Sequence, residues 1–145
     1  MVRTERKDGR RMPRWGVWRP YWVRVGGAPF LQRRIIVICP WFAVLYTRIH
    51  LPDGDRDPHD HSRSFASLIL TGEYTEKVYG SPDDLTHVRY RRHRRYSWHV
   101  LRREQAHQIT AVSRSLLRTL VIAGPYRGPA TFWTPEGKVS WEDYG

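Results

Sequence analysis

The stretch HDHSRSFASLILTGEYTE, residues 59–76, decides the fold of this chain. It begins with two histidines one position apart, His59 and His61, and continues into an apolar run that ends at Gly72. In an extended strand, residues i and i+2 point to the same face, so the two imidazoles project together and lie roughly 6–7 Å apart along the backbone. Two neutral imidazoles at this spacing can chelate one divalent metal ion. A pair of surface histidines without a ligand would show the same pattern.

The rest of the chain also has the pattern of β-strands. Short runs rich in β-branched and aromatic residues alternate with turn residues, at a spacing of about 8–12 residues that is typical of sandwiches and barrels. The sequence contains no long amphipathic helical pattern. We therefore predict an all-β sandwich or barrel, with strands in residues 33–39, 41–51, 64–70, 73–80, 106–112 and 116–125 and one or two strands in residues 88–101.

Positive charge is concentrated at the N-terminus. The 145 residues carry a formal net charge of +11 at pH 7, and residues 1–34 hold ten basic and two acidic side chains against fifteen and twelve in residues 35–145. We predict a basic N-terminal arm over residues 1–34 and a β-barrel domain over residues 35–145. The arm can contact nucleic acid through phosphates, or it can simply be a solvated terminus.

The compartment is predicted from what the sequence lacks. Its one cysteine, Cys39, excludes an internal disulfide and fits a reducing environment. Charged residues at the start leave no apolar segment of a signal peptide. The longest apolar run, Ile35–Tyr46, is interrupted by Pro40 and is too short to span a bilayer. We expect a cytoplasmic protein with no membrane segment.

Residues 59–72 resemble the first motif of the cupin superfamily, in which HxH is followed by Glu and then by Gly. The spacing here is the same, but Phe65 stands in the place of Glu. His107, in AHQI at the start of a later apolar strand, is the candidate for the histidine of the second motif. The segments GEYTE, TLVIAGP and FWTPEG add a closer similarity, over residues 46–144, to small cupin-like proteins of bacteria and their phages.

The resemblance implies a cupin-like double-stranded β-helix, or jelly roll, that holds a divalent metal through His59, His61 and His107. Because cupins often pair through sheet edges, it also implies a homodimer, with Trp15–Val25 as the candidate exchanged arm. Iron is the first candidate for that ion, with Mn, Ni or Zn as alternatives. If Thr71–Gly72 is a two-residue hairpin turn, Glu76 faces the barrel interior, either as a fourth ligand or as a pocket acid. Tyr74 shares that face. We predict these two, Glu76 and Tyr74, as the catalytic residues.

Three functions follow from these features. The first is a metal-dependent enzyme acting on a small molecule, foremost an iron dioxygenase-like one. The second is a non-catalytic cupin that binds a sugar or another small ligand. The third is a basic accessory protein whose stretch RYRRHRRYSW, residues 89–98, binds nucleic acid weakly through arginines and aromatic rings. In this stretch we expect His93 to be exposed in a basic setting. We leave His99, the residue that follows the stretch, unassigned.

Overall fold

The computed structural model describes residues 12–25, 28–50, 52, 56–113, 116–141 and 143–144, and it describes no side chains over 22–29. All regular structure in these residues is β-strand, which confirms the predicted all-β class. None of the described residues belongs to a helix that is long and apolar enough to cross a membrane.

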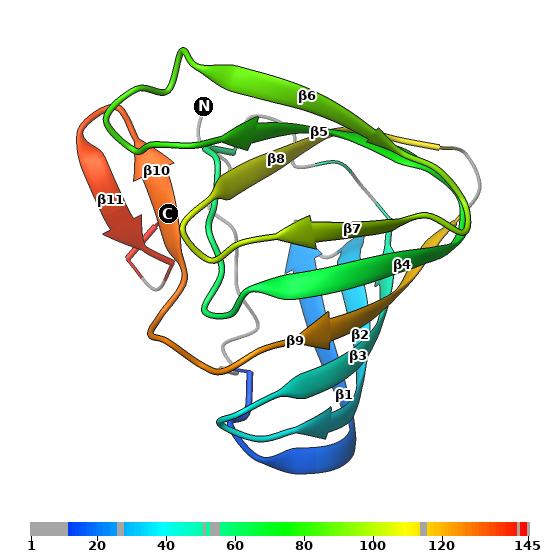
Figure 1. The fold of residues 1–145 in the computed structure, drawn as a ribbon. Coiled ribbons are helices and arrows are strands. Elements are labelled where there is room, and N and C mark those ends of the chain that lie inside the picture. The colour runs from blue at the N-terminus through cyan, green and yellow to red at the C-terminus, as the bar shows by residue number, and fades with distance from the viewer. Residues whose placement is uncertain are drawn as a thin grey trace.

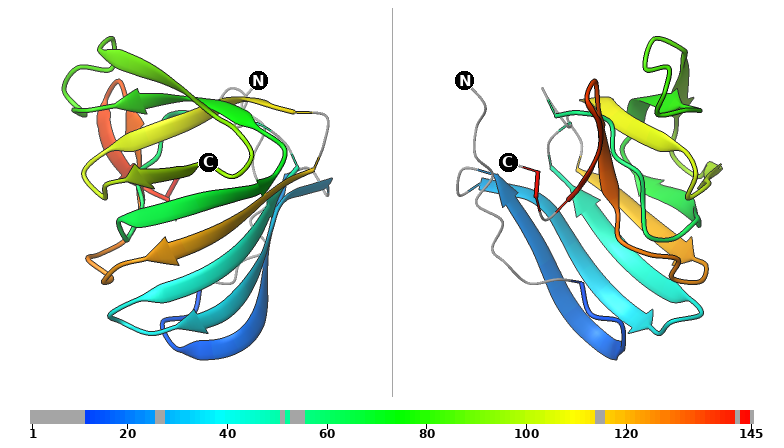
Figure 2. Two further views of the ribbon diagram at one scale, coloured as in Figure 1. Left: turned by 45° about the vertical axis from the view of Figure 1, so that its right-hand side comes forward. Right: turned by 90° about the vertical axis from the view of Figure 1, so that its left-hand side faces the viewer.

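Two antiparallel layers face each other (Figures 1 and 2). The larger is a six-stranded sheet with the order β1 (Gly16–Val25), β2 (Ala28–Ile38), β3 (Ala43–Ile49), β9 (Leu117–Ala123), β4 (Phe65–Thr71), β7 (Trp98–Leu101). The smaller is a three-stranded sheet with the order β6 (Val88–His93), β5 (Tyr74–Tyr79), β8 (Ala106–Val112). A two-stranded ribbon of β10 (Thr131–Thr134) and β11 (Gly137–Ser140) stands beside the smaller layer (Figure 1).

The interior between the layers has apolar ends and a polar middle. One apolar cluster forms around Ile35, Leu45 and Val121, and a second around Ile69, Tyr74 and Leu117. Because alternate strand residues share a face, the positions between these clusters also point inward. On β2, β3 and β9 these positions are Arg33, Thr47 and Thr119, which lie directly opposite one another in the register. The larger sheet therefore carries a row of polar groups into the barrel.

The predicted hairpin between residues 64–70 and 73–80 is wrong. β4 pairs with β7 and β9, whereas β5 pairs with β6 and β8 in the other layer. Gly72 has a φ of 78°, a left-handed conformation that glycine adopts without steric cost, and at this corner the chain passes from one sheet to the other. Residues 88–101 likewise divide into β6 and β7, one in each layer.

The predicted boundary between a basic arm and a barrel falls within β2. The described part of residues 1–34 forms β1 and the first half of β2, and β2 pairs with β3 along its length. Trp15–Val25 overlaps β1, which pairs with β2 of its own chain. The division into two parts stays a prediction.

Candidate metal centre

The segment that carries His59 and His61 is fixed between β8 and β10. The backbone N–H of His59 donates to the carbonyl of His107 at 3.0 Å, and the N–H of His107 donates back to His59 at 3.0 Å. On its other side, His59 forms a β-bridge with Phe132. A directly opposed pair in an antiparallel ladder brings its side chains close together, so the backbone itself places two of the three histidines side by side.

Asp60 points away from the histidines and anchors the segment. Its carboxylate accepts hydrogen bonds from the backbone N–H and the hydroxyl of Thr131, both at 2.6 Å, and from the indole N–H of Trp133 at 2.9 Å. All of these donors lie on β10. Because residues on either side of Asp60 in an extended chain face the opposite way, this anchoring turns His59 and His61 toward the interior.

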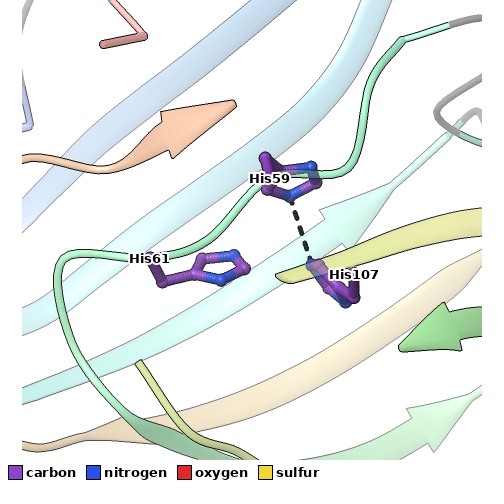
Figure 3. A group of neighbouring side chains, drawn as sticks. All are labelled: His59, His61 and His107. Atoms are coloured by element: carbon purple, nitrogen blue, oxygen red, sulfur yellow. Dashed lines mark hydrogen bonds between the residues drawn. The ribbon is translucent and has the colours of Figure 1, made fainter. Parts of the chain in front are cut away.

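The three predicted ligands converge on one point (Figure 3). One nitrogen of each of His59, His61 and His107 lies within 4.8 Å of the other two. The Nε2 atoms of His59 and His107 are only 3.2 Å apart, and the ring centroids of the three pairs are 4.7–5.0 Å apart. The Nδ1 atoms of His59 and His61 are buried with no hydrogen-bond partner among the described residues.

The electrostatic setting keeps the imidazoles of His59 and His61 neutral. Burial lowers the pKa of His59 well below its usual value, and the neighbouring His107 and His61 lower it further. Burial and His107 also lower the pKa of His61 well below its usual value, and the charge of Arg33 adds to the effect. A neutral imidazole has a free lone pair, which is the form that binds a metal ion.

Glu76 lies behind His107 and orients its ring. The side chain is fully buried, and its Oε2 accepts a hydrogen bond from Nδ1 of His107 at 2.7 Å. Oε1 accepts from Nε2 of His93 at 2.9 Å and from the guanidinium of Arg91 at 2.9 and 3.1 Å. Burial would raise the pKa of Glu76, but the hydrogen bonds from both histidines and the charge of Arg91 outweigh it and lower that pKa. The carboxylate is therefore ionised and turned toward these donors.

An aromatic ring occupies the position of the motif glutamate. The ring of Phe65 meets that of His61 edge-on, with centroids 4.9 Å apart, and packs against the apolar cluster around Ile35. The site therefore offers three nitrogen donors, with the nearest carboxylate, Glu76, one hydrogen bond behind them.

Tyr74 belongs to a second polar group that continues from Glu76. Its hydroxyl donates to Nε2 of His99 at 2.5 Å, and the His99 ring stacks on His93 with centroids 3.8 Å apart. Burial and the charge of Glu76 raise the pKa of Tyr74 well above its usual value, partly offset by Arg91. Burial lowers the pKa of His99 to about 3, assisted by His93. At neutral pH, Tyr74 is therefore a phenol that donates to a neutral imidazole.

The expectation that His93 is exposed is wrong, because its side chain is buried against Glu76. Its arginine-rich neighbours concealed the inward face of β6, on which Arg91 and His93 lie two residues apart. His99 shares the inward face of β7 with the apolar Leu101. Strand alternation around Leu101 was the signal that could have identified His99 as an interior residue.

The arginine-rich stretch is divided between two surroundings. Arg91 pairs with the buried Glu76, and Arg92 pairs with the exposed Glu73 at 2.7 Å. Arg95 donates to the carbonyl of Leu70 at 3.1 Å. The predicted weak binding of nucleic acid by this stretch stays a prediction.

No protein-family model and no curated protein matches the sequence. Solved structures do match in fold. A cupin 2 conserved barrel domain protein from Rhodopseudomonas palustris is 16% identical, with a TM-score of 0.55 over 81% of this chain and 77% of that chain. HppE in its Fe(II) form is 12% identical, with a TM-score of 0.58 over 72% of this chain and 55% of that chain.

A third match is the DMSP lyase DddQ from Ruegeria pomeroyi DSS-3, 17% identical, with a TM-score of 0.52 over 82% of this chain and 53% of that chain. This chain thus spans little more than half of the length of HppE and of DddQ. At these identities the similarity is one of fold.

Proposed function

We propose, from the premise that this chain has the cupin fold, that it binds one divalent metal ion through His59, His61 and His107 and acts as a metal-dependent enzyme on a small molecule. The observation that carries the proposal is the convergence of three imidazoles on one point, where burial lowers the pKa of His59 and of His61 well below the usual value. Fold similarity is the only link to the reactions of other cupins, so the donor set supports the metal more directly than it supports any reaction.

A metal ion fits these nitrogens better than a hydrogen-bonded cluster does. The Nε2 atoms of His59 and His107 approach to 3.2 Å, although Glu76 already accepts the Nδ1 proton of His107. A neutral imidazole carries one N–H, so the Nε2 of His107 is left as a lone pair. A hydrogen bond from Nε2 of His59 to that lone pair joins only two of the rings, whereas a cation shared by the three rings would also engage His61.

The donor set favours a first-row transition metal with open coordination positions. Imidazole ligands suit Fe, Ni, Cu and Zn, and a site with three protein ligands keeps room for substrate or water. We propose iron first, with Mn, Ni or Zn as alternatives, and a dioxygenase-like reaction as the first activity to test. When bound, such a metal supplies Lewis acidity and, for iron, redox chemistry.

The chain's own residues would prepare this site. Glu76 holds the Nδ1 proton of His107, which fixes the tautomer with a free Nε2 and makes the ring a stronger ligand. Phe65 leaves one side of His61 apolar and closed to water. Glu76 would therefore act as a positioning residue. We propose Tyr74, with His99 behind it, as a hydrogen-bonding group of the pocket.

The first experiment is metal analysis by mass spectrometry of protein prepared without a histidine tag. We expect about one equivalent of metal in the parent protein, a loss in His59→Ala and in His107→Ala, and no change in His87→Ala. His87 is a matched control because it is an exposed histidine in the turn before β6. Protein that takes up no metal after reconstitution with iron, manganese, nickel or zinc would contradict the proposal.

A second candidate, binding of single-stranded nucleic acid, is supported by one surface. Trp15, Trp18 and Trp41 are 60%, 68% and 66% exposed, and Trp15 meets Trp41 edge-on at 5.5 Å. The guanidinium of Arg34 lies 5.2 Å from the Trp18 ring centroid. Exposed rings next to arginines are the combination that stacks bases and neutralises phosphates. This function would not depend on the histidines.

A further inference from the structure

Arg33 brings an isolated positive charge into the barrel. It lies on β2, opposite Tyr21 of β1 and Thr47 of β3, and it shares the inward face with the buried Ile35. Its Nε donates to the hydroxyl of Thr47 at 3.2 Å, and its Nη1 lies 3.5 Å from the sulfur of Met12. Neither partner carries a charge that could balance the guanidinium.

No carboxylate pairs with Arg33 in the described part of the chain. Arg91 on β6, by contrast, has Glu76 as its partner. Burial lowers the pKa of Arg33, and only the nearby Tyr21 hydroxyl opposes that effect. A guanidinium withdrawn from water without a counter-charge lowers stability, so its presence calls for a function.

The position of Arg33 connects it to the candidate metal centre. Arg33 shares the inward face of β2 with Ile35. Phe65 packs against the apolar cluster that contains Ile35, and its ring meets that of His61 with centroids 4.9 Å apart. Arg33 also begins the polar row that continues through Thr47 and Thr119 between the two apolar clusters. A cation and three metal-ligating nitrogens thus belong to one interior.

We propose that Arg33 binds the anionic group of the substrate, and that the site takes a small organic acid, a carboxylate or a phosphonate, whose other end reaches the metal held by His59, His61 and His107. This inference rests on the proposed function, because it names the class of molecule that the same site would take. The guanidinium is planar and offers parallel N–H groups that match the two oxygens of a carboxylate or of a phosphonate. Its Nε donates to the Thr47 hydroxyl, and its Nη1 meets the weakly accepting sulfur of Met12, a contact that an oxygen of the ligand would replace.

The size of the substrate follows from the enclosure. Arg33 and the three histidines share the inner space of one small barrel, and Tyr21, Phe65 and Met12 pack against the apolar cluster on this side. A substrate that bridges Arg33 and the metal is therefore short, with its middle part against apolar side chains. A sugar without an acid group would leave Arg33 without a counter-charge.

The test measures anion binding by calorimetry on metal-loaded protein with three probes. These are lactate, its neutral counterpart lactamide, and methylphosphonate. Two variants are compared, Arg33→Gln and the control Arg48→Gln. Arg48 lies one residue beyond Thr47 on β3 and is exposed, so the control makes the same charge change on the outer face of the same sheet.

We expect lactate, methylphosphonate or both to bind the parent protein at least about 10-fold more tightly than lactamide. In Arg33→Gln we expect that affinity to fall roughly 10- to 100-fold, the range for loss of hydrogen bonds between charged groups. In Arg48→Gln we expect no change. The acid that binds more tightly identifies the anionic group. Lactamide binding as tight as that of both acids, or equal acid affinities in Arg33→Gln and the parent protein, would overturn the proposal.

Metal content separates this inference from the proposed function. A protein that binds no metal contradicts the function itself, whereas a protein with one equivalent of metal and no preference for acids contradicts only the role of Arg33. If Arg33→Gln does not fold, Arg33→Lys keeps the charge and removes the planar fork. We then expect weaker acid binding at full metal content, and unchanged binding in that variant would overturn the proposal.

Discussion

Substitution of Glu76 by Gln tests whether this carboxylate prepares His107 for a metal. The Glu76 carboxylate accepts hydrogen bonds from Arg91, His93 and His107. Glutamine has nearly the same volume, but it presents an amide to these three donors. If its NH₂ group faces Nδ1 of His107, that nitrogen becomes an acceptor and the ring proton moves to Nε2. The tautomer with a lone pair at Nε2 is then lost, and we expect metal affinity to fall roughly 10- to 100-fold.

The same substitution breaks a buried ion pair. Glu76 is fully buried, and the Arg91 side chain is only 21% exposed, so the variant leaves a cation with little water around it. Breaking a buried pair by removing one partner costs about 3–5 kcal/mol, and we expect about 3 kcal/mol because Arg91 keeps some contact with solvent. Urea unfolding of metal-free protein measures this term, and competition with a chelator measures the metal affinity.

Glu73→Gln is the matched control. Glu73 pairs with Arg92 at 2.7 Å, but the two side chains are 41% and 56% exposed, so we expect a loss of at most about 0.5 kcal/mol and no change in metal affinity. The reasoning fails if Glu76→Gln and Glu73→Gln unfold at the same urea concentration. It also fails if Glu76→Gln binds metal as tightly as the parent protein, because Glu76 would then have no influence on the His107 ring.

Three further predictions follow from the site and the surface. Since burial lowers the pKa of His99 to about 3, the unfolded chain binds this proton first as the pH falls below about 6.5, and the free energy of unfolding of metal-free protein should drop by about 1.4 kcal/mol per pH unit. Urea unfolding at pH 7 and 5.5 should show a smaller drop in His99→Gln than in the parent protein, and an equal drop would contradict the assignment. Phe65→Glu should bind metal more tightly in chelator competition. It should also lower the stability of metal-free protein by about 3 kcal/mol, because it removes a packed ring and buries a charge. Unchanged metal affinity would show that this position does not face the ion. If the exposed tryptophans bind single-stranded nucleic acid, Trp18→Ala and Trp41→Ala should each weaken oligonucleotide binding by about 1–3 kcal/mol in anisotropy titrations, whereas His107→Ala should not; binding that does not weaken with added salt would exclude this function.

The sequence was informative where local rules decide the structure. The strand pattern predicted the β-class, and the HxH spacing identified two histidines that do converge with His107. Glu76 does face inward, but that direction was predicted from a hairpin that does not form. These features depend on the two-residue period of a strand and on a motif of fixed length. Both are properties of neighbouring residues, so the sequence alone contains them.

Strand pairing was harder to predict, because it depends on residues far apart in the chain. The turn at Gly72 is compatible both with a hairpin and with a corner between two sheets, and only the partners of β4 and β5 distinguish these possibilities. His93 shows the same limit. Its neighbours in sequence are arginines, but its partner on the adjacent strand β5 is Tyr74, and the His93 ring lies beside Glu76.

Arg33 shows how a count of charges can conceal a site. In the sequence it is one of ten basic residues in a segment predicted to be an arm, and its charge is indistinguishable from theirs. In the structure it faces the interior at the same level as Thr47, without a carboxylate partner among the described residues. Glu76, by contrast, is paired with Arg91 and hydrogen-bonded to two histidines, and the buried Arg63 donates to the backbone carbonyls of Cys39 and Gly124. We therefore expect the anionic group of the substrate to provide the counter-charge that Arg33 lacks among the described residues.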